Sequence, residues 1–122
     1  MIKLLYIAAG GALGSVMRYN VGRWATALLG ANGFLPWGTL SVNVIGSFLI
    51  GLCLHIIPRD HAFGLFIVTG VLGGFTTFSA FSVESLTLLK SPHPAQGIIY
   101  IALSIFLSLG AVYLGTQIKN HV

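Results

Sequence analysis

Polar side chains recur at every fourth position within two otherwise apolar stretches of the sequence. The two series are Thr39, Asn43 and Ser47, and Tyr100, Ser104 and Ser108. Residues four apart lie on one face of an α-helix. A serine or threonine hydroxyl can bond to its own helix backbone, whereas the carboxamide of Asn43 carries donors and acceptors that such a bond does not satisfy. The series therefore indicate a hydrated path, or a helix interface, lined by hydroxyl and amide groups.

A glycine-rich segment lies in the middle of a third apolar stretch. Residues 70–81 read GVLGGFTTFSAF, and more polar residues follow, namely Ser82, Glu84 and Ser85. Glycine weakens the interior of a helix, and adjacent β-branched threonines weaken it further. A break here would leave backbone carbonyl groups at membrane depth, where they need a partner helix, water or a cation. A continuous helix whose glycines serve packing is the alternative.

Two phenylalanines and two arginines add features that suit an anion. Phe78 and Phe81 are three apart and share a helix face. The edge of an aromatic ring carries partial positive charge, so edges that face a polar path would attract a small anion. Packing or lipid contact is the alternative for both rings. Arg18 and Arg23 would raise the potential at the mouth of such a path, unless Arg23 only extends to the lipid interface.

Four apolar stretches of the chain hold these residues. They cover residues 4–29, 39–57, 62–89 and 95–118. A helix of about 20 residues crosses the hydrocarbon core of a bilayer, and backbone exposed to lipid must be helical. Because the connections are short, the sequence predicts one transmembrane domain, residues 1–122, that is an all-α membrane protein.

Composition excludes several classes of protein. Hydrophobic residues make up 56% of the chain and charged residues only 7%, whereas soluble domains carry about a quarter charged residues. The mean hydropathy is +0.94. The basic residues are scattered, so the net charge of +4 does not indicate a nucleic-acid partner. One cysteine and four scattered histidines form no catalytic or metal-binding constellation, so we expect a protein that is not an enzyme. Because no ATP-binding motif is present, any transport is expected to be passive.

The charges at the ends of the spans leave the orientation open. One side of the membrane would receive Lys3, Arg59 and Lys119, and the other Lys90 and Arg23. Such a weak bias fits insertion in both orientations, with subunits paired as an antiparallel dimer, and equally fits a weakly biased single topology. Small residues at close spacing permit close helix contact in lipid and favour a homo-oligomer. They are Gly10 with Gly14, Ser47 with Gly51, and Gly110 with Gly115.

Three segments of the sequence resemble the motifs of the Fluc (CrcB) family of small dual-topology fluoride ion channels. They are residues 10–19 (GGALGSVMRY), 38–46 (GTLSVNVIG) and 73–81 (GGFTTFSAF), in family order, and the similarity covers essentially the whole chain. The resemblance implies an antiparallel homodimer with four transmembrane helices per subunit, the third broken at its glycine-rich segment. It further implies two passive pores per dimer that export fluoride from the cytoplasm across the inner (plasma) membrane and relieve fluoride toxicity.

The resemblance also implies roles for particular residues. With the polar series, it gives as fluoride-pore candidates Asn43, Phe78, Phe81, Thr39, Ser79, Tyr100, Ser104 and Ser108. Arg18 is expected in a vestibule. A structural sodium ion at the dimer interface is expected on the main-chain carbonyls of Gly73 and Thr76. Ala80 departs from the family, which usually carries a hydroxyl there, and this would weaken an ion site or conduction.

A dual-topology small multidrug transporter is the main alternative function. That mechanism needs a carboxylate embedded in the membrane near the middle of the first span. Glu84 is the only candidate, and it lies late in the third span, where a place near the lipid headgroups is the simpler interpretation. A purely structural subunit would leave Asn43 and the two polar series unexplained. The fluoride channel is therefore the favoured prediction.

Overall fold

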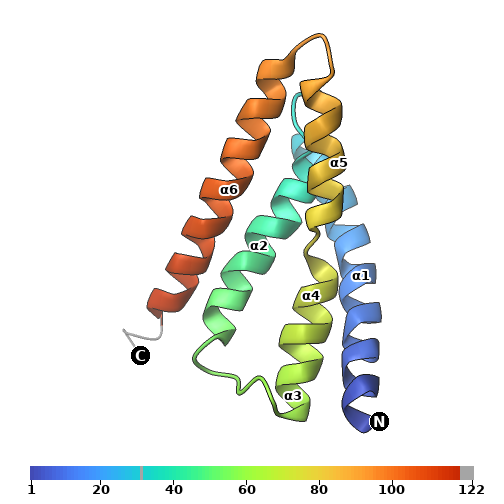
Figure 1. The fold of residues 1–122 in the computed structure, drawn as a ribbon, viewed down its shortest axis with the longest axis vertical. Helices are drawn as coiled ribbons and strands as arrows, with labels where there is room; N and C mark the ends of the chain where they lie inside the picture. The colour runs from blue at the N-terminus through green and yellow to red at the C-terminus, as the bar shows by residue number, and fades with distance from the viewer. Residues whose placement is uncertain (31, 119–122) are drawn as a thin grey trace.

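In a computed structural model the chain forms helices joined by short turns, and residues 1–30 and 32–118 are described. The helices are α1 (Ile2–Leu29), α2 (Trp37–Cys53), α3 (Ala62–Gly64), the π-helix η1 (Leu65–Leu72), α4 (Gly73–Phe75), α5 (Phe78–Leu89) and α6 (Pro94–Gln117). Because α3, η1, α4 and α5 follow one another along one rod, here called the third rod, there are four rods (Figure 1). The described residues contain no strand, so the predicted all-α fold with four helices is confirmed.

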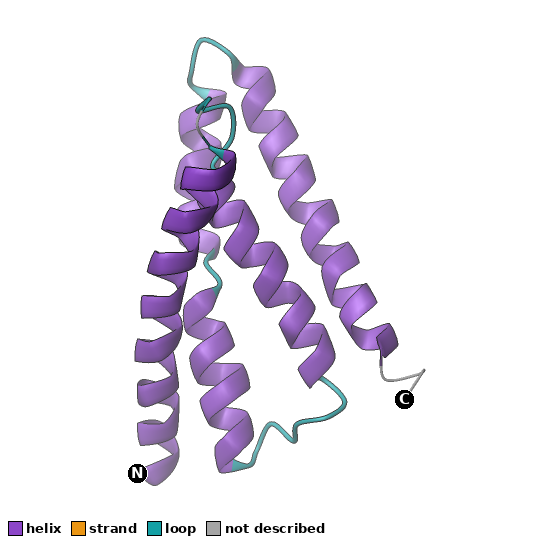
Figure 2. Ribbon diagram, turned by 180° about the vertical axis from the view of Figure 1, so that it is seen from behind, coloured by secondary structure: helices purple, strands orange, loops and turns teal. Residues whose placement is uncertain are grey.

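The rods run alternately in opposite directions along the long axis (Figures 1 and 2). The beginning of α1 and the end of α6 therefore lie at the same end of the molecule, as an even number of spans predicts. The turns after α1 and α5 lie at the opposite end. Lys119, one of the charges compared above, lies outside the described residues.

Two of the rods are long and apolar enough to cross a membrane. They are residues 62–89, taken through their interruption, and α6, while α2 is a shorter apolar helix of 17 residues. Residues 54–57 continue beyond α2 as turns, in which the N–H of Ile57 donates to the carbonyl of Cys53 at 3.0 Å. Pro58 disfavours helical backbone at the residue before it, which is one reason why α2 ends before the predicted limit at residue 57.

Glycines set the distances between neighbouring rods. A Cβ added at Gly70 would lie 2.8 Å from the Cα of Gly10, so α1 and the third rod meet almost backbone to backbone. A Cβ added at Gly51 would lie 3.1 Å from the Cα of Gly115, which makes the same kind of contact between α2 and α6. Such small residues let helices approach closely in lipid. By contrast, Gly110 has no neighbour within 4 Å of an added Cβ.

A small buried cluster closes the end of the molecule near the α1–α2 turn. Leu35, Leu40 and Tyr100 are its buried members, and Phe81 packs against it from α5. Tyr100 is fully buried, with 0% of its surface exposed. An aromatic side chain with a hydroxyl usually has a hydrogen-bond partner when it is buried, so this phenol is expected to have an acceptor.

Candidate functional site

The third rod is interrupted at two residues between α4 and α5. Thr76 has φ −86° and ψ 157°, and Thr77 has φ −150° and ψ 119°, so both are extended. The break therefore lies at two β-branched threonines, which favour extended backbone. Gly73 and Gly74 just before them remain helical. Gly74 serves close packing instead, since a Cβ there would lie 2.6 Å from the carbonyl oxygen of Gly11.

Asn43 on α2 bonds to both polar groups of one peptide residue in the break. The N–H of Thr77 donates to Asn43 Oδ1 at 2.8 Å, and Asn43 Nδ2 donates to the carbonyl of Thr77 at 2.9 Å. A continuous helix would direct the N–H of Thr77 to the carbonyl of Gly73, four residues earlier. Asn43 Oδ1 therefore accepts the N–H of Thr77, which in a continuous helix would bond to the carbonyl of Gly73.

Threonine side chains complete the two ends of the break. The Thr77 hydroxyl oxygen accepts a 3.2 Å bond from the N–H of Ala80, which caps the first turn of α5. Thr76 donates its hydroxyl to the carbonyl of Leu72 at 3.1 Å. Ser79, a pore candidate, is exposed, and its hydroxyl oxygen lies 3.3 Å from that of Thr77.

A cavity of about 400 Å³ lies between α2, the break and α6. We call it the α6-side cavity. Ser47 and both threonines of the break line it. Five of the predicted pore residues also line it, namely Asn43, Phe78, Phe81, Ser104 and Ser108. The hydroxyl oxygen of Ser104 is buried and has no hydrogen-bond partner among the described residues. This cavity thus brings together side chains from three rods that the sequence places far apart.

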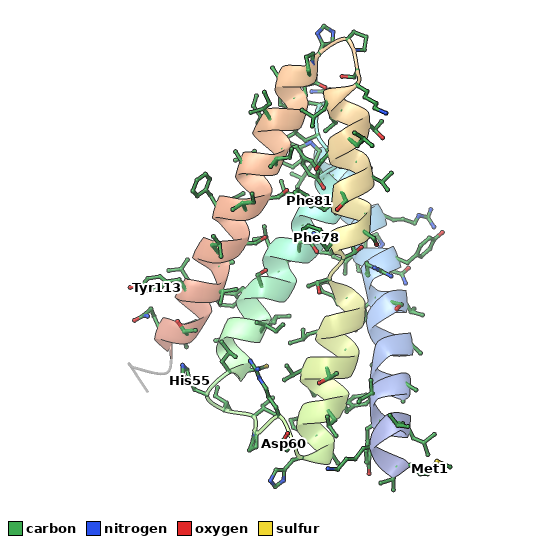
Figure 3. All side chains as sticks on the ribbon, viewed as in Figure 1. Met1, His55, Asp60, Phe78, Phe81 and Tyr113 are labelled. Atoms are coloured by element: carbon green, nitrogen blue, oxygen red, sulfur yellow. The ribbon has the colours of Figure 1, made fainter. Side chains whose placement is uncertain are left out.

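The two phenylalanines stand at the start of α5, beside the break (Figure 3). Their ring centroids are 5.4 Å apart with planes inclined by 47°. Phe81 is also 5.5 Å from the ring of Tyr100, so it belongs both to the cavity wall and to the buried cluster. Phe78 is 78% exposed in the single chain and makes the smaller contribution to packing.

Glu84 lies at the meeting point of α2, α5 and α6. Thr39 donates its hydroxyl to Oε1 at 2.7 Å, and Tyr100 donates its hydroxyl to Oε2 at 2.7 Å. The sequence alone indicates for Glu84 only a transporter carboxylate or a place near the headgroups, and does not predict this arrangement. The signal was that each polar series begins with a hydroxyl, at Thr39 and at Tyr100, that needs an acceptor.

A second cavity, of about 570 Å³, lies between α1, α2 and α5. We call it the α1-side cavity. Its charged lining residues are Arg18, Arg23 and Glu84, and Thr39, Thr77 and Ala80 also line it. The guanidinium of Arg23 lies over the ring of Tyr19, 5.6 Å from its centroid. Thr77 lines both cavities, so the break stands where they adjoin.

The main chain of the break suits a cation better than any side-chain cluster does. Gly73 is exposed, and its carbonyl has lost its usual helical donor to Asn43. Within residues 1–30 and 32–118 no group of three or more His, Cys, Asp or Glu could hold a metal ion. Carbonyl oxygens are hard neutral ligands, which suit hard cations more than soft, thiolate-preferring metal ions. The residues present therefore fit the expected sodium ion.

Comparison with known proteins decides the family. Residues 5–116 match the family described as "CrcB-like protein, Camphor Resistance (CrcB)". The chain belongs to the CrcB family. The resemblance noted in the sequence is thereby confirmed.

Several CrcB relatives match this chain along nearly its full length. A protein of Rhizobium etli is 48% identical, with 98% of each chain covered, and one of Agrobacterium fabrum is 47% identical, with 100% of this chain and 99% of the relative covered. A protein of Thermus thermophilus is 47% identical over 95% of this chain and 92% of its own. Each of the three is named "Fluoride-specific ion channel FluC". Together with the apolar rods, CrcB membership identifies this chain as a membrane protein.

Proposed function

We propose that this CrcB protein is a passive fluoride-selective ion channel that exports fluoride from the cytoplasm. The observation that carries the proposal is the α6-side cavity, which polar side chains and two phenylalanine rings line at the beginning of a helix. The names of the full-length relatives support the choice of fluoride as the ion. Passive transport agrees with the lack of an ATP-binding motif in the sequence.

The chemistry of the cavity suits a small, strongly hydrated anion. Such an ion enters a narrow path only if hydrogen-bond donors replace its water. The first turn of α5 presents the positive end of its dipole near Phe78, and ring edges add partial positive charge. Ser104 and Ser108 of α6 also line this cavity and bring hydroxyl groups to its wall. On the other side of the break, Arg18 and Arg23 favour anion entry into the α1-side cavity.

The proposed assembly is an antiparallel homodimer in the inner (plasma) membrane, with two pores. Support for a second subunit comes from the exposed position of Gly73 and from the open walls of the α6-side cavity, whose Phe78 is mostly uncovered. In this assembly the main-chain carbonyls of Gly73 and Thr76 of both subunits would hold a structural sodium ion. Sodium would supply a fixed positive charge that ties the two subunits together at the break.

The multidrug-transporter alternative requires a carboxylate that is free to bind a proton or a cationic drug. Both oxygens of Glu84 instead accept short hydrogen bonds, from Thr39 and Tyr100. No observation in the described residues favours that alternative over the channel.

Fluoride efflux from liposomes tests the proposed function directly. Purified protein is reconstituted into liposomes loaded with potassium fluoride, and release is followed with a fluoride electrode after a potassium ionophore removes the electrical barrier. We expect rapid fluoride release and no chloride release from matched chloride-loaded liposomes. Fluoride release no faster than from protein-free liposomes would reject the proposal.

A further inference from the structure

Both polar atoms of the Asn43 side chain form a hydrogen bond to a single backbone residue. Its Oδ1 accepts from the N–H of Thr77 at 2.8 Å and its Nδ2 donates to the carbonyl of Thr77 at 2.9 Å, across 34 residues of sequence. Thr77 is extended, with φ −150° and ψ 119°. This exchange of two bonds with one extended residue is the pattern of a hydrogen-bonded pair in an antiparallel sheet. The side chain of Asn43 therefore bonds to Thr77 as the backbone of a neighbouring antiparallel strand would.

Only a carboxamide supplies this pair of bonds. It holds one acceptor and one set of donors side by side, at the spacing of a peptide group. An ionised aspartate at the same place would offer two acceptors and would set one of them against the carbonyl of Thr77. A serine offers a single hydroxyl and cannot reach both groups. The need for both bonds therefore favours a carboxamide at this position.

The clamp fixes both sides of the break. With its N–H held by Asn43, Thr77 does not bond to the carbonyl of Gly73, so this oxygen stays available at the end of α4. In the same conformation the Thr77 hydroxyl oxygen caps the N–H of Ala80 at the start of α5. Thr77 also lines both cavities. Asn43 on α2 thus influences both the carbonyl of Gly73, which would face the cation, and the start of α5, which would face the anion.

We propose that Asn43 is a positioning residue, which clamps Thr77 in an extended conformation and thereby keeps the main chain of the break available to the interfacial cation. The inference rests on the proposed sodium site. It gives Asn43 a role beyond the expected pore lining, because one N–H of Nδ2 and the Oδ1 atom bond to Thr77 while the residue also lines the α6-side cavity. Its loss should weaken sodium binding as well as fluoride flux.

Two measurements without fluoride test this role. The variants are Asn43→Ala, which removes both bonds, and Asn43→Ser, which is milder. Ser47→Ala is the matched control, because Ser47 lies one turn further along α2 and lines the same cavity. The first measurement is hydrogen exchange at the Thr77 amide by NMR in detergent, and the second is the sodium concentration that gives half of the maximal thermal stabilisation of the dimer. Asn43→Ser, which loses about one hydrogen bond, should raise the exchange rate of the Thr77 amide and the half-maximal sodium concentration about tenfold, and Asn43→Ala should raise both further. Ser47→Ala should leave both unchanged.

The unmodified protein provides a test that needs no variant. If the clamp supports sodium binding, sodium must support the clamp by the same factor, because coupling between two equilibria is reciprocal. Replacing potassium by sodium should therefore slow exchange at Thr77. The proposal is overturned if exchange at Thr77 is insensitive to sodium, or if Asn43→Ser loses fluoride flux while keeping the sodium dependence of the unmodified dimer. Absence of fluoride flux in the unmodified protein would reject the channel function, but these two measurements would still decide the role of Asn43.

Discussion

Tyr100 on α6 donates a 2.7 Å hydrogen bond to Oε2 of Glu84 on α5. The phenol is fully buried, and the other carboxylate oxygen of Glu84 accepts from Thr39 on α2 at 2.7 Å. A carboxylate in an apolar region is costly unless its lone pairs are occupied, and bonds to a charged group are about twice as strong as neutral ones. Glu84 therefore links three rods through two hydroxyl donors from the two polar series.

Removing one of these donors should destabilise the protein. Tyr100→Phe keeps the ring in the buried cluster but leaves Oε2 of Glu84 without a partner, which should cost about 1–3 kcal/mol. Thermal unfolding in detergent measures this loss. Tyr113→Phe is the control, because Tyr113 on the same helix is 64% exposed, and it should unfold at the temperature of the unmodified protein. Equal unfolding temperatures for the two variants would show that Glu84 does not depend on Tyr100.

Neighbouring glycines on α1 should respond differently to the same substitution. A Cβ at Gly10 would collide with the carbonyl of Phe66 and lie 2.9 Å from the Cα of Gly70, whereas a Cβ at Gly11 would have no neighbour within 4 Å. Alanine is otherwise the better helix former by about 1 kcal/mol. Gly10→Ala should therefore be destabilising by about 1–3 kcal/mol, as overpacking usually is. Gly11→Ala should be neutral or stabilising, and chemical denaturation of both variants measures the difference.

The sequence was sufficient for the all-helical fold because it contains four apolar stretches joined by short turns. The uncharged stretch before Lys119 predicted the rod that α6 forms, and the glycines of α1 pointed to close helix packing. The sequence predicts a break within residues 70–81, but does not show that Thr76 and Thr77 are the residues that leave the helix. Glycine and threonine both weaken a helix. Two contacts in the structure show why the threonines are the residues that extend: Gly74 packs against Gly11, and Asn43 bonds to the N–H and carbonyl of Thr77.

The partners of the polar side chains were beyond reach from the sequence. Asn43 was recognised as a residue that needs partners, but Thr77 is 34 positions away and its N–H is free only because the helix breaks there. Glu84 was assigned no partner, because Thr39 and Tyr100 lie 45 and 16 positions from it on other rods. Such pairs depend on how the rods pack, and a pattern on one helix does not contain that information.

The phenylalanine pair offers a test of the anion path. Phe78→Ile and Phe81→Ile keep apolar bulk but remove the electropositive ring edge, so fluoride efflux from liposomes should fall at least about tenfold, corresponding to about 1.4 kcal/mol in the barrier. Methionine at either position should retain more flux, because its sulfur is polarizable. Phe106→Ile is the control, since Phe106 on α6 is 73% exposed and does not line the cavity. Unchanged flux in both test variants would assign the rings to packing alone.

The weak charge bias makes a prediction about orientation that positively charged substitutions can test. Asn32 and His93 are exposed in the two turns at one end of the molecule, while Asp60 and His61 are exposed in the turn at the other end. Adding lysines at one end should hold that end in the cytoplasm. Asn32→Lys with His93→Lys, and Asp60→Lys with His61→Lys, should therefore insert in opposite orientations. If the functional unit is an antiparallel dimer, each double variant alone should give vesicles without fluoride flux, and co-expression of the two should restore it.

Asn32→Gln with His93→Gln, which adds no charge, should remain active alone. A lysine variant that is fully active by itself would mean that one orientation is enough, which would contradict the antiparallel dimer.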